Sequence, residues 1–223
     1  MKSYDVITLP GVLHLVFKTR KAMNIAMCRL SEFYESPSAE IRGKHFCLAE
    51  FIDAYSDEHG GIAYFEDIEG HNIPGGVVDS FFELFELSKF EQAVQAAWGG
   101  GYKYLIATDE ESELSTITHE MAHAKWFMDK AYREKAKAVL DSIGGRLRSK
   151  MVLDLLAYGV PDTEIVWDEM HAYLISANEA ELNTVFKGVR MSDIAPYIRA
   201  LRALNGESWE YDDDDEKHEL MHC

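Results

Sequence analysis

One segment in the middle of the chain, TITHEMAHAKWFM at 116–128, restricts the possible folds more than any other. Its apolar residues are spread around nearly the whole helical circumference: Ile117, Met121, Ala122, Ala124, Trp126, Phe127 and Met128. A helix that is apolar nearly all round is buried, so other elements must pack around it. His119, Glu120 and His123 lie on this helix, and polar side chains in such a place need a partner.

The spacing of these three residues is typical of a metal site. Side chains four apart on a helix are separated by about 40° around its axis, so His119 and His123 can reach one ion. Glu120 leans over the same face, where it can accept a proton from water without binding the metal itself. A helix is expected here because a strand precedes it and N-cap candidates lie ahead of it: Asp109, Ser112 and Ser115.

A catalytic zinc commonly has three protein ligands and one open position, so a third ligand is needed. Glu169 fits best, because its helical face is otherwise apolar or small: Ile165, Val166, Ala172, Tyr173, Ser176 and Ala180. A carboxylate on such a face is costly unless it is paired or bound to a metal. We predict that Glu169 is the third ligand; a buried salt bridge to an arginine is the alternative. Asp168 and His171 fall on the other side of this helix, and His171 is interpreted as a structural or surface residue.

Three other carboxylates are weaker candidates for the third ligand. Asp129 would suit an extended motif, but Trp126 stands where that motif has a helix-ending glycine, so Asp129 is expected to lie away from the two histidines. Glu134 lies among basic residues, which is typical of a solvated face, and Glu164 lies at a helix start, where the helix dipole favours a carboxylate.

Tyr173 follows Glu169 by one helical turn on the same face. Its hydroxyl could donate a hydrogen bond to an oxyanion that develops during a reaction. A tyrosine that only fills the core is the equal alternative.

The same pentapeptide pattern occurs a second time, as His218-Glu219-x-x-His222 near the C-terminus. It follows four consecutive aspartates within 206–223, a segment with eight carboxylates and one lysine. Such a block is usually a solvated, flexible tail. We therefore expect the internal copy to hold the metal, although an upstream ligand or Cys223 could still make a site at the second copy.

The order of the remaining elements predicts an α+β fold. Short strands are expected at 4–9, 11–19 and 102–109, and 62–76 is interpreted as a strand, a turn and a loop. Helices are expected near 21–36 and 47–59, one or two helices at 77–98, and further helices at 112–129, 131–142, 146–158, 162–177 and 190–204. Segregated strands and helices favour a small N-terminal mixed sheet bordering the active-site helix and a predominantly helical C-terminal half. We predict one domain at 1–205 and the acidic tail at 206–223.

Composition narrows the classes of partner. Acidic residues outnumber basic ones 39 to 22 in 223 residues, for a net charge of −17, which disfavours nucleic acid and membrane surfaces as partners. We expect no signal peptide and no membrane-spanning segment, because no apolar run approaches the roughly 20 residues required. Three widely spaced cysteines do not suggest a disulfide framework, so a cytoplasmic location is expected.

The strand YKYLIATD, the helix with HEMAH and the downstream DEMHAYL together resemble the zincin superfamily of metallopeptidases, gluzincin type. The resemblance covers residues 102–173. It implies Zn²⁺ bound by His119, His123 and Glu169, with Glu120 as general base and a peptide or protein as substrate. The alternative is a non-enzymatic binding or regulatory protein in which a fourth side chain, such as His171 or a tail histidine, closes the metal site. A tail that folds back into the active site and inhibits it is a third hypothesis.

Overall fold

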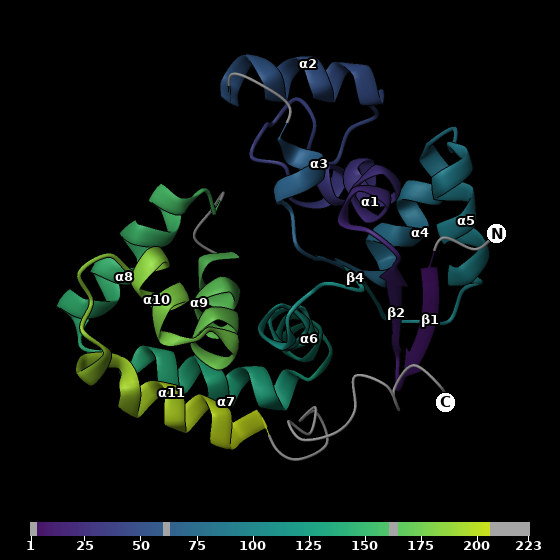
Figure 1. Cartoon of the computed structure of the whole chain (residues 1–223). Helices are drawn as coiled ribbons and strands as arrows, with labels where there is room; N and C mark the ends of the chain where they lie inside the picture. The colour runs from purple at the N-terminus through teal and green to yellow at the C-terminus, as the bar shows by residue number, and fades with distance from the viewer. Residues whose placement is uncertain (1–3, 60–62, 161–164, 206–223) are drawn as a thin grey trace. The chain divides into compact units, whose positions relative to one another are not determined.

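The computed structural model describes residues 4–59, 63–160 and 165–205 (Figure 1). The chain divides into two compact units, with the boundary between Ser112 and Glu113. The first unit contains the sheet and the second is helical, which confirms the predicted α+β class, the small N-terminal sheet and the helical C-terminal half. The single domain at 1–205 and the placement of the sheet beside the active-site helix stay predictions. Within the described residues, no helix is long and apolar enough to cross a membrane.

The sheet of the first unit has four strands in the order β1-β2-β4-β3. These are β1 (Tyr4–Leu9), β2 (Val12–Phe17), β3 (His71–Pro74) and β4 (Tyr104–Asp109). The β1–β2 and β3–β4 pairs are antiparallel, whereas β2 and β4 are parallel. Because parallel strands need a long crossover connection, the helices between β2 and β4 belong to that connection.

The first two strands form the hairpin that the sequence suggests. Leu9 pairs with Val12, so Pro10 and Gly11 alone make the turn. Gly11 has a φ of 81°, which only glycine adopts without steric cost.

In the described part of the crossover between β2 and β4 there are five helices: α1 (Arg20–Glu35), α2 (Leu48–His59), α3 (Tyr64–Asp67), α4 (Gly75–Leu84) and α5 (Lys89–Trp98). Alternate residues of β2 and β4 form one side of the hydrophobic core with side chains of α1, α4 and α5. The members at its centre are Leu13, Leu15, Leu105, Met27, Phe81 and Val94. The intervening residues of β2 and β4 are buried as well, so each central strand is covered on both faces along its whole length.

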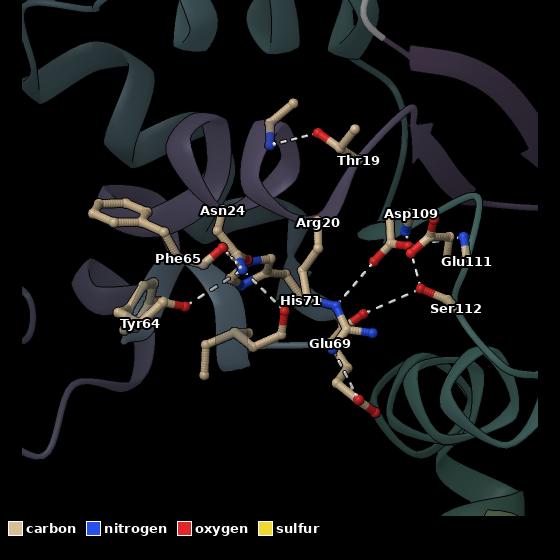
Figure 2. Close-up of polar contacts among 12 residues, drawn as sticks. Thr19, Arg20, Asn24, Tyr64, Phe65, Glu69, His71, Asp109, Glu111 and Ser112 are labelled. Atoms are coloured by element: carbon tan, nitrogen blue, oxygen red, sulfur yellow. Dashed lines mark hydrogen bonds and ion pairs between the residues drawn. The ribbon is translucent and has the colours of Figure 1, made fainter. Parts of the chain in front are cut away.

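The region 62–76 differs from the prediction of a strand, a turn and a loop. Residues 64–67 form the short helix α3, and the strand in this region is β3 at its end. The cause is the buried Asn24 of α1, whose amide donates hydrogen bonds to the carbonyl groups of Tyr64, Phe65 and Ile68 (Figure 2). These bonds satisfy carbonyls that a strand would pair within the sheet, so tertiary contacts override the β propensity of the segment.

The same asparagine holds His71, the first residue of β3. The Asn24 Oδ1 atom lies 2.7 Å from Nε2 of His71, and the Ser31 hydroxyl lies 2.9 Å from Nδ1. Because the Asn24 oxygen only accepts, His71 carries its proton on Nε2 and accepts from Ser31 through Nδ1. His71, Asn24 and Ser31 are all buried, so the network joins β3 to α1 and does not face solvent.

A second polar cluster shapes the chain after β4. The Asp109 carboxylate accepts from Arg20 Nε at 3.3 Å and from the Glu111 backbone at 2.8 Å (Figure 2). The Ser112 hydroxyl bonds to the Asp109 backbone and to the Glu69 carbonyl. Asp109 and Ser112, expected as N-caps, instead fix the turn that ends the first unit.

The second unit consists of α6 (Leu114–Met128), α7 (Lys130–Asp141), α8 (Gly145–Tyr158), α9 (Ile165–Ser176), α10 (Glu179–Val185) and α11 (Met191–Asn205). Five of these were predicted, whereas α10 was missed. Its N-terminus has a capping box, in which Asn178 accepts from the Glu181 backbone and the Glu181 side chain accepts from the Asn178 backbone. That signal was present in the sequence.

The helices of the second unit enclose their own hydrophobic core. Its fully buried members include Ala136, Leu140, Met151, Leu155, Met170, Leu174, Phe186 and Leu201. α6 packs along α9, and α7 and α11 lie side by side (Figure 1). On α6 all seven residues from Glu120 to Trp126 are buried, which confirms the expected buried helix, although Phe127 is exposed.

We predict that acid destabilises the first unit through its two buried histidines. Burial lowers the pKa of His14 to about 4 and that of His71 to about 3. The unfolded chain binds protons near pH 6.5 and the folded unit does not, so this stability is complete above pH 6.5 and is lost as pH falls toward 4. Between these limits each histidine contributes a slope of about 1.4 kcal/mol per pH unit.

Urea unfolding at several pH values would measure this slope, with the buried Cys28 thiol of α1 as the probe of the first unit. In a Cys47→Ser, Cys223→Ser protein, where Cys28 is the remaining thiol, its reaction with dithiodipyridine reports unfolding of that unit. In the His14→Val protein, the slope of the unfolding free energy against pH should be smaller by about 1.4 kcal/mol per pH unit. This change corresponds to one proton fewer taken up on unfolding. His45→Gln, at an exposed histidine, is the matched control and should leave the slope unchanged. Equal slopes in all three proteins would contradict the prediction.

Candidate metal centre

The two histidines of α6 and a glutamate of α9 bring their donor atoms together. Nε2 of His119 lies 3.1 Å from Nε2 of His123. The Glu169 carboxylate lies 3.5 Å from the first of these nitrogens and 3.6 Å from the second, through different oxygens. With a single oxygen of Glu169, the three donor atoms still lie within 4.8 Å of one another.

These distances match the size of a tetrahedral zinc site. Zinc binds nitrogen and oxygen ligands at about 2.0–2.2 Å, so neighbouring ligand atoms of a tetrahedron are about 3.3–3.6 Å apart. The two imidazole nitrogens, 3.1 Å apart, and Nε2 of His119 with one Glu169 oxygen, 3.5 Å apart, lie near that range, and all three donor atoms stay within 4.8 Å of one another. The residues present therefore fit the ion that the sequence predicts.

The outer nitrogens of both histidines have hydrogen-bond acceptors. Nδ1 of His123 lies 3.1 Å from Oδ2 of Asp168. Nδ1 of His119 lies 3.3 Å from the Ser176 hydroxyl, whose own proton goes to the Ala172 carbonyl at 2.8 Å. Both Nδ1 atoms are therefore donors, and in each neutral imidazole the Nε2 atom carries a lone pair.

Two imidazole lone pairs and a carboxylate thus converge on one point. Three acceptors at such short distances repel one another unless a cation lies between them. Outer hydrogen bonds of this kind fix the tautomer and orientation of histidines that bind metals. The arrangement favours a metal with nitrogen and oxygen ligands.

The electrostatics of the site show the same need for positive charge, which a proton on His123 meets when no metal is bound. Burial alone would lower the pKa of His123, but the charges of Asp168 and Glu169 raise it to about 10. Burial likewise would raise the pKa of Glu169, but His123 and His119 hold it below its usual range. Burial raises the pKa of Asp168. The potential at the site is therefore negative, which attracts any cation.

Glu120 and Tyr173 lie next to the ligands, as the sequence suggests. Glu120 is buried, and its charge acts on both His123 and Tyr173. The Tyr173 ring meets the His119 ring edge-on, with centroids 4.7 Å apart. Burial, Glu169 and Tyr158 all raise the pKa of the Tyr173 hydroxyl, so it remains protonated near neutral pH.

The expectation that Asp168 lies away from the site was wrong, because its carboxylate bonds to His123. His171, interpreted as structural or surface, is fully buried and faces Asp168. An imidazole has two nitrogens on opposite edges, so neighbouring α9 residues can serve one histidine from two sides. Ser176 was missed too, although its position on the Glu169 face was visible in the sequence.

The rejected candidates lie elsewhere. α6 ends at Met128, and the Asp129 side chain caps the next helix by accepting from the Tyr132 backbone. Glu134 is exposed on α7. Glu164 and the second pattern, His218-Glu219-x-x-His222, lie outside the described residues.

No protein-family model matches this chain, and neither a curated protein nor a solved structure matches it. The case for a metal centre rests on the geometry above.

We predict that the full-length chain binds about one zinc per molecule at this site. The experiment uses protein with His218→Ala and His222→Ala, so that the second pattern does not contribute. His119→Ala should abolish binding because it removes one of three ligands. Elemental analysis after purification without chelator measures the zinc content, and zinc at 100 times its dissociation constant should stabilise the protein by about 2.7 kcal/mol.

The matched control is His45→Ala, at an exposed histidine of the first unit, which should keep its zinc. Zinc retained at full stoichiometry after His119→Ala would rule out this site.

Proposed function

We propose that the chain is a zinc-dependent hydrolase, a peptidase of the gluzincin type. The observation that carries the proposal is the convergence of His119, His123 and Glu169, with both histidine tautomers set by outer hydrogen bonds. The ligand set, two histidines of one helix and a glutamate of a later helix, is the one that the resemblance implies.

The number of ligands supports a catalytic site over a structural one. Closed structural zinc sites usually have four protein ligands, whereas catalytic sites keep one position open. Among the residues that the structure describes, the cluster has three members. His171, a candidate fourth ligand, has Nε2 bonded to Tyr132 at 2.7 Å, and its Nδ1 faces Asp168. A non-enzymatic, metal-stabilised protein is therefore the less favoured alternative.

A substrate would reach the metal site from the side of His119 and Glu169, because these side chains are more exposed than that of His123. The side chains of His119 and Glu169 are 17% and 18% exposed, whereas that of His123 is 3% exposed. A substrate carbonyl would approach on the exposed side, where Tyr173 also lies.

Each residue would have a distinct role in hydrolysis. Zinc held by the three ligands would lower the pKa of a water molecule and polarise the substrate carbonyl. Glu120 would accept the proton of the attacking water and transfer it to the leaving amine. The Tyr173 hydroxyl would donate to the oxygen that becomes negative. Asp168 and Ser176 would hold the two imidazoles in place.

We predict that Glu120→Gln abolishes hydrolysis while zinc stays bound. Glutamine cannot accept the proton, and a general base contributes about 10²–10⁴-fold to the rate. Turnover of a quenched fluorescent peptide library by the zinc-loaded full-length chain measures activity, and elemental analysis measures zinc.

Glu113→Gln is the matched control, because Glu113 is exposed at the start of the same helix and makes no side-chain cap. It should retain both activity and zinc. A Glu120→Gln protein with unchanged turnover would overturn the proposed mechanism, and a zinc-loaded parent that cleaves no peptide would overturn the proposed substrate.

A further inference from the structure

Asp168 lies between His123, which is a predicted metal ligand, and His171, which is not. Its Oδ2 atom accepts from the predicted metal ligand His123, and its Oδ1 atom lies 3.9 Å from Nδ1 of His171. Within the described part of the chain, neither Oδ1 of Asp168 nor Nδ1 of His171 has a hydrogen-bond partner, and both atoms are buried. A buried polar atom without a hydrogen-bond partner destabilises the folded state. Oδ1 of Asp168 and Nδ1 of His171 face each other at 3.9 Å without a hydrogen bond, so their placement needs an explanation.

The orientation of His171 is fixed on every side. The residue is fully buried, and its ring packs against Trp126, with centroids 4.9 Å apart, and against Tyr132, with centroids 5.4 Å apart. The Tyr132 hydroxyl lies 2.7 Å from Nε2. The imidazole can therefore present Nδ1 only toward Asp168.

The donors and acceptors around His171 determine which of its ring nitrogens carries the proton. A carboxylate oxygen only accepts, so Nδ1 of His171, which faces Oδ1, carries the proton. Nε2 then has the lone pair and accepts from the Tyr132 hydroxyl. The N–H dipole of His171 points at Asp168 on the side opposite His123.

Tyr132 is in turn held by the helix that carries the metal ligands. The Lys125 ammonium of α6 lies 4.5 Å from the centre of the Tyr132 ring. The same ammonium bonds to the carbonyl and side chain of Asn205, the last residue of α11. The contacts thus form a closed path from His123 of α6 through α9 and α7 back to α6.

We propose that His171 and Tyr132 are positioning residues of the metal centre, acting through Asp168 to hold His123 in the tautomer and orientation that bind the metal. This inference rests on the proposed metal binding by His123. The competing explanation is that His171 and Tyr132 only fill the core of the helical unit.

A double-mutant cycle on zinc affinity separates the two explanations. The measurements use the full-length chain with His218→Ala and His222→Ala, and competition with a chromophoric chelator gives the zinc dissociation constant. Outer-shell substitutions weaken metal binding by about 10–100-fold, so Asp168→Asn and His171→Leu should each have an effect of this order. In the Asp168→Asn protein, His171→Leu should cause no further loss, because its route to His123 has already been removed.

If the His171→Leu protein does not fold, Tyr132→Phe provides the test instead. This substitution removes a single oxygen atom, so the protein should still fold. It should weaken zinc binding in the parent and not in the Asp168→Asn protein. It should also shift the visible absorption of the Co²⁺-substituted chain, which reports the geometry around the metal. Tyr197→Phe, which removes a hydroxyl bonded to Ser142 elsewhere in the unit, is the matched control and should change neither measurement.

The outcomes distinguish this inference from the proposed function. Equal losses of affinity from His171→Leu or Tyr132→Phe in both backgrounds would show a packing role and overturn the positioning role. Unchanged affinity and an unchanged cobalt spectrum in Tyr132→Phe would do the same. A parent chain that binds no zinc would overturn the proposed function and this inference together.

Discussion

Two imidazole lone pairs and a carboxylate pointing at one another impose the main constraint on the helical unit. α6 and α9 can keep this register only if positive charge lies between His119, His123 and Glu169, because like-charged or acceptor-only groups in a poorly solvated site repel strongly. The other features of the unit follow from it. α9 supplies acceptors to the outer nitrogens, and α7 and α11 hold the residues behind them.

The three residues of the central cluster were predictable from the sequence, whereas the residues around them were not. Periodicity identifies His119, His123 and Glu169, because each is a polar residue on an otherwise apolar helical face. A helical wheel sorts residues by angle alone, and it therefore separated Asp168 from Glu169. The wheel does not show that one imidazole can contact both carboxylates, one through each of its ring nitrogens. Such contacts depend on how two helices pack, which no single helix encodes.

The first unit shows the same division between local and tertiary information. The β1–β2 hairpin and β4 were predictable, because turn residues and β-branched runs are local signals. The helix α3 was not, because its carbonyls bond to Asn24, which is far away in the sequence. β3 is a short edge strand whose first side chain is buried among residues of α1, and its neighbours in sequence do not reveal this.

The partners of α9 also give this centre a recognisable sequence signature. The pentapeptide His-Glu-x-x-His occurs twice in this chain alone, so it identifies little by itself. The spacing Asp168-Glu169-x-His171-x-Tyr173-x-x-Ser176 adds five positions. Four of these side chains contact His119 or His123, and the fifth, His171, faces Asp168. A search for both patterns in order would select chains by physical contacts. It would also separate relatives of this protein from sequences in which the pentapeptide occurs by chance.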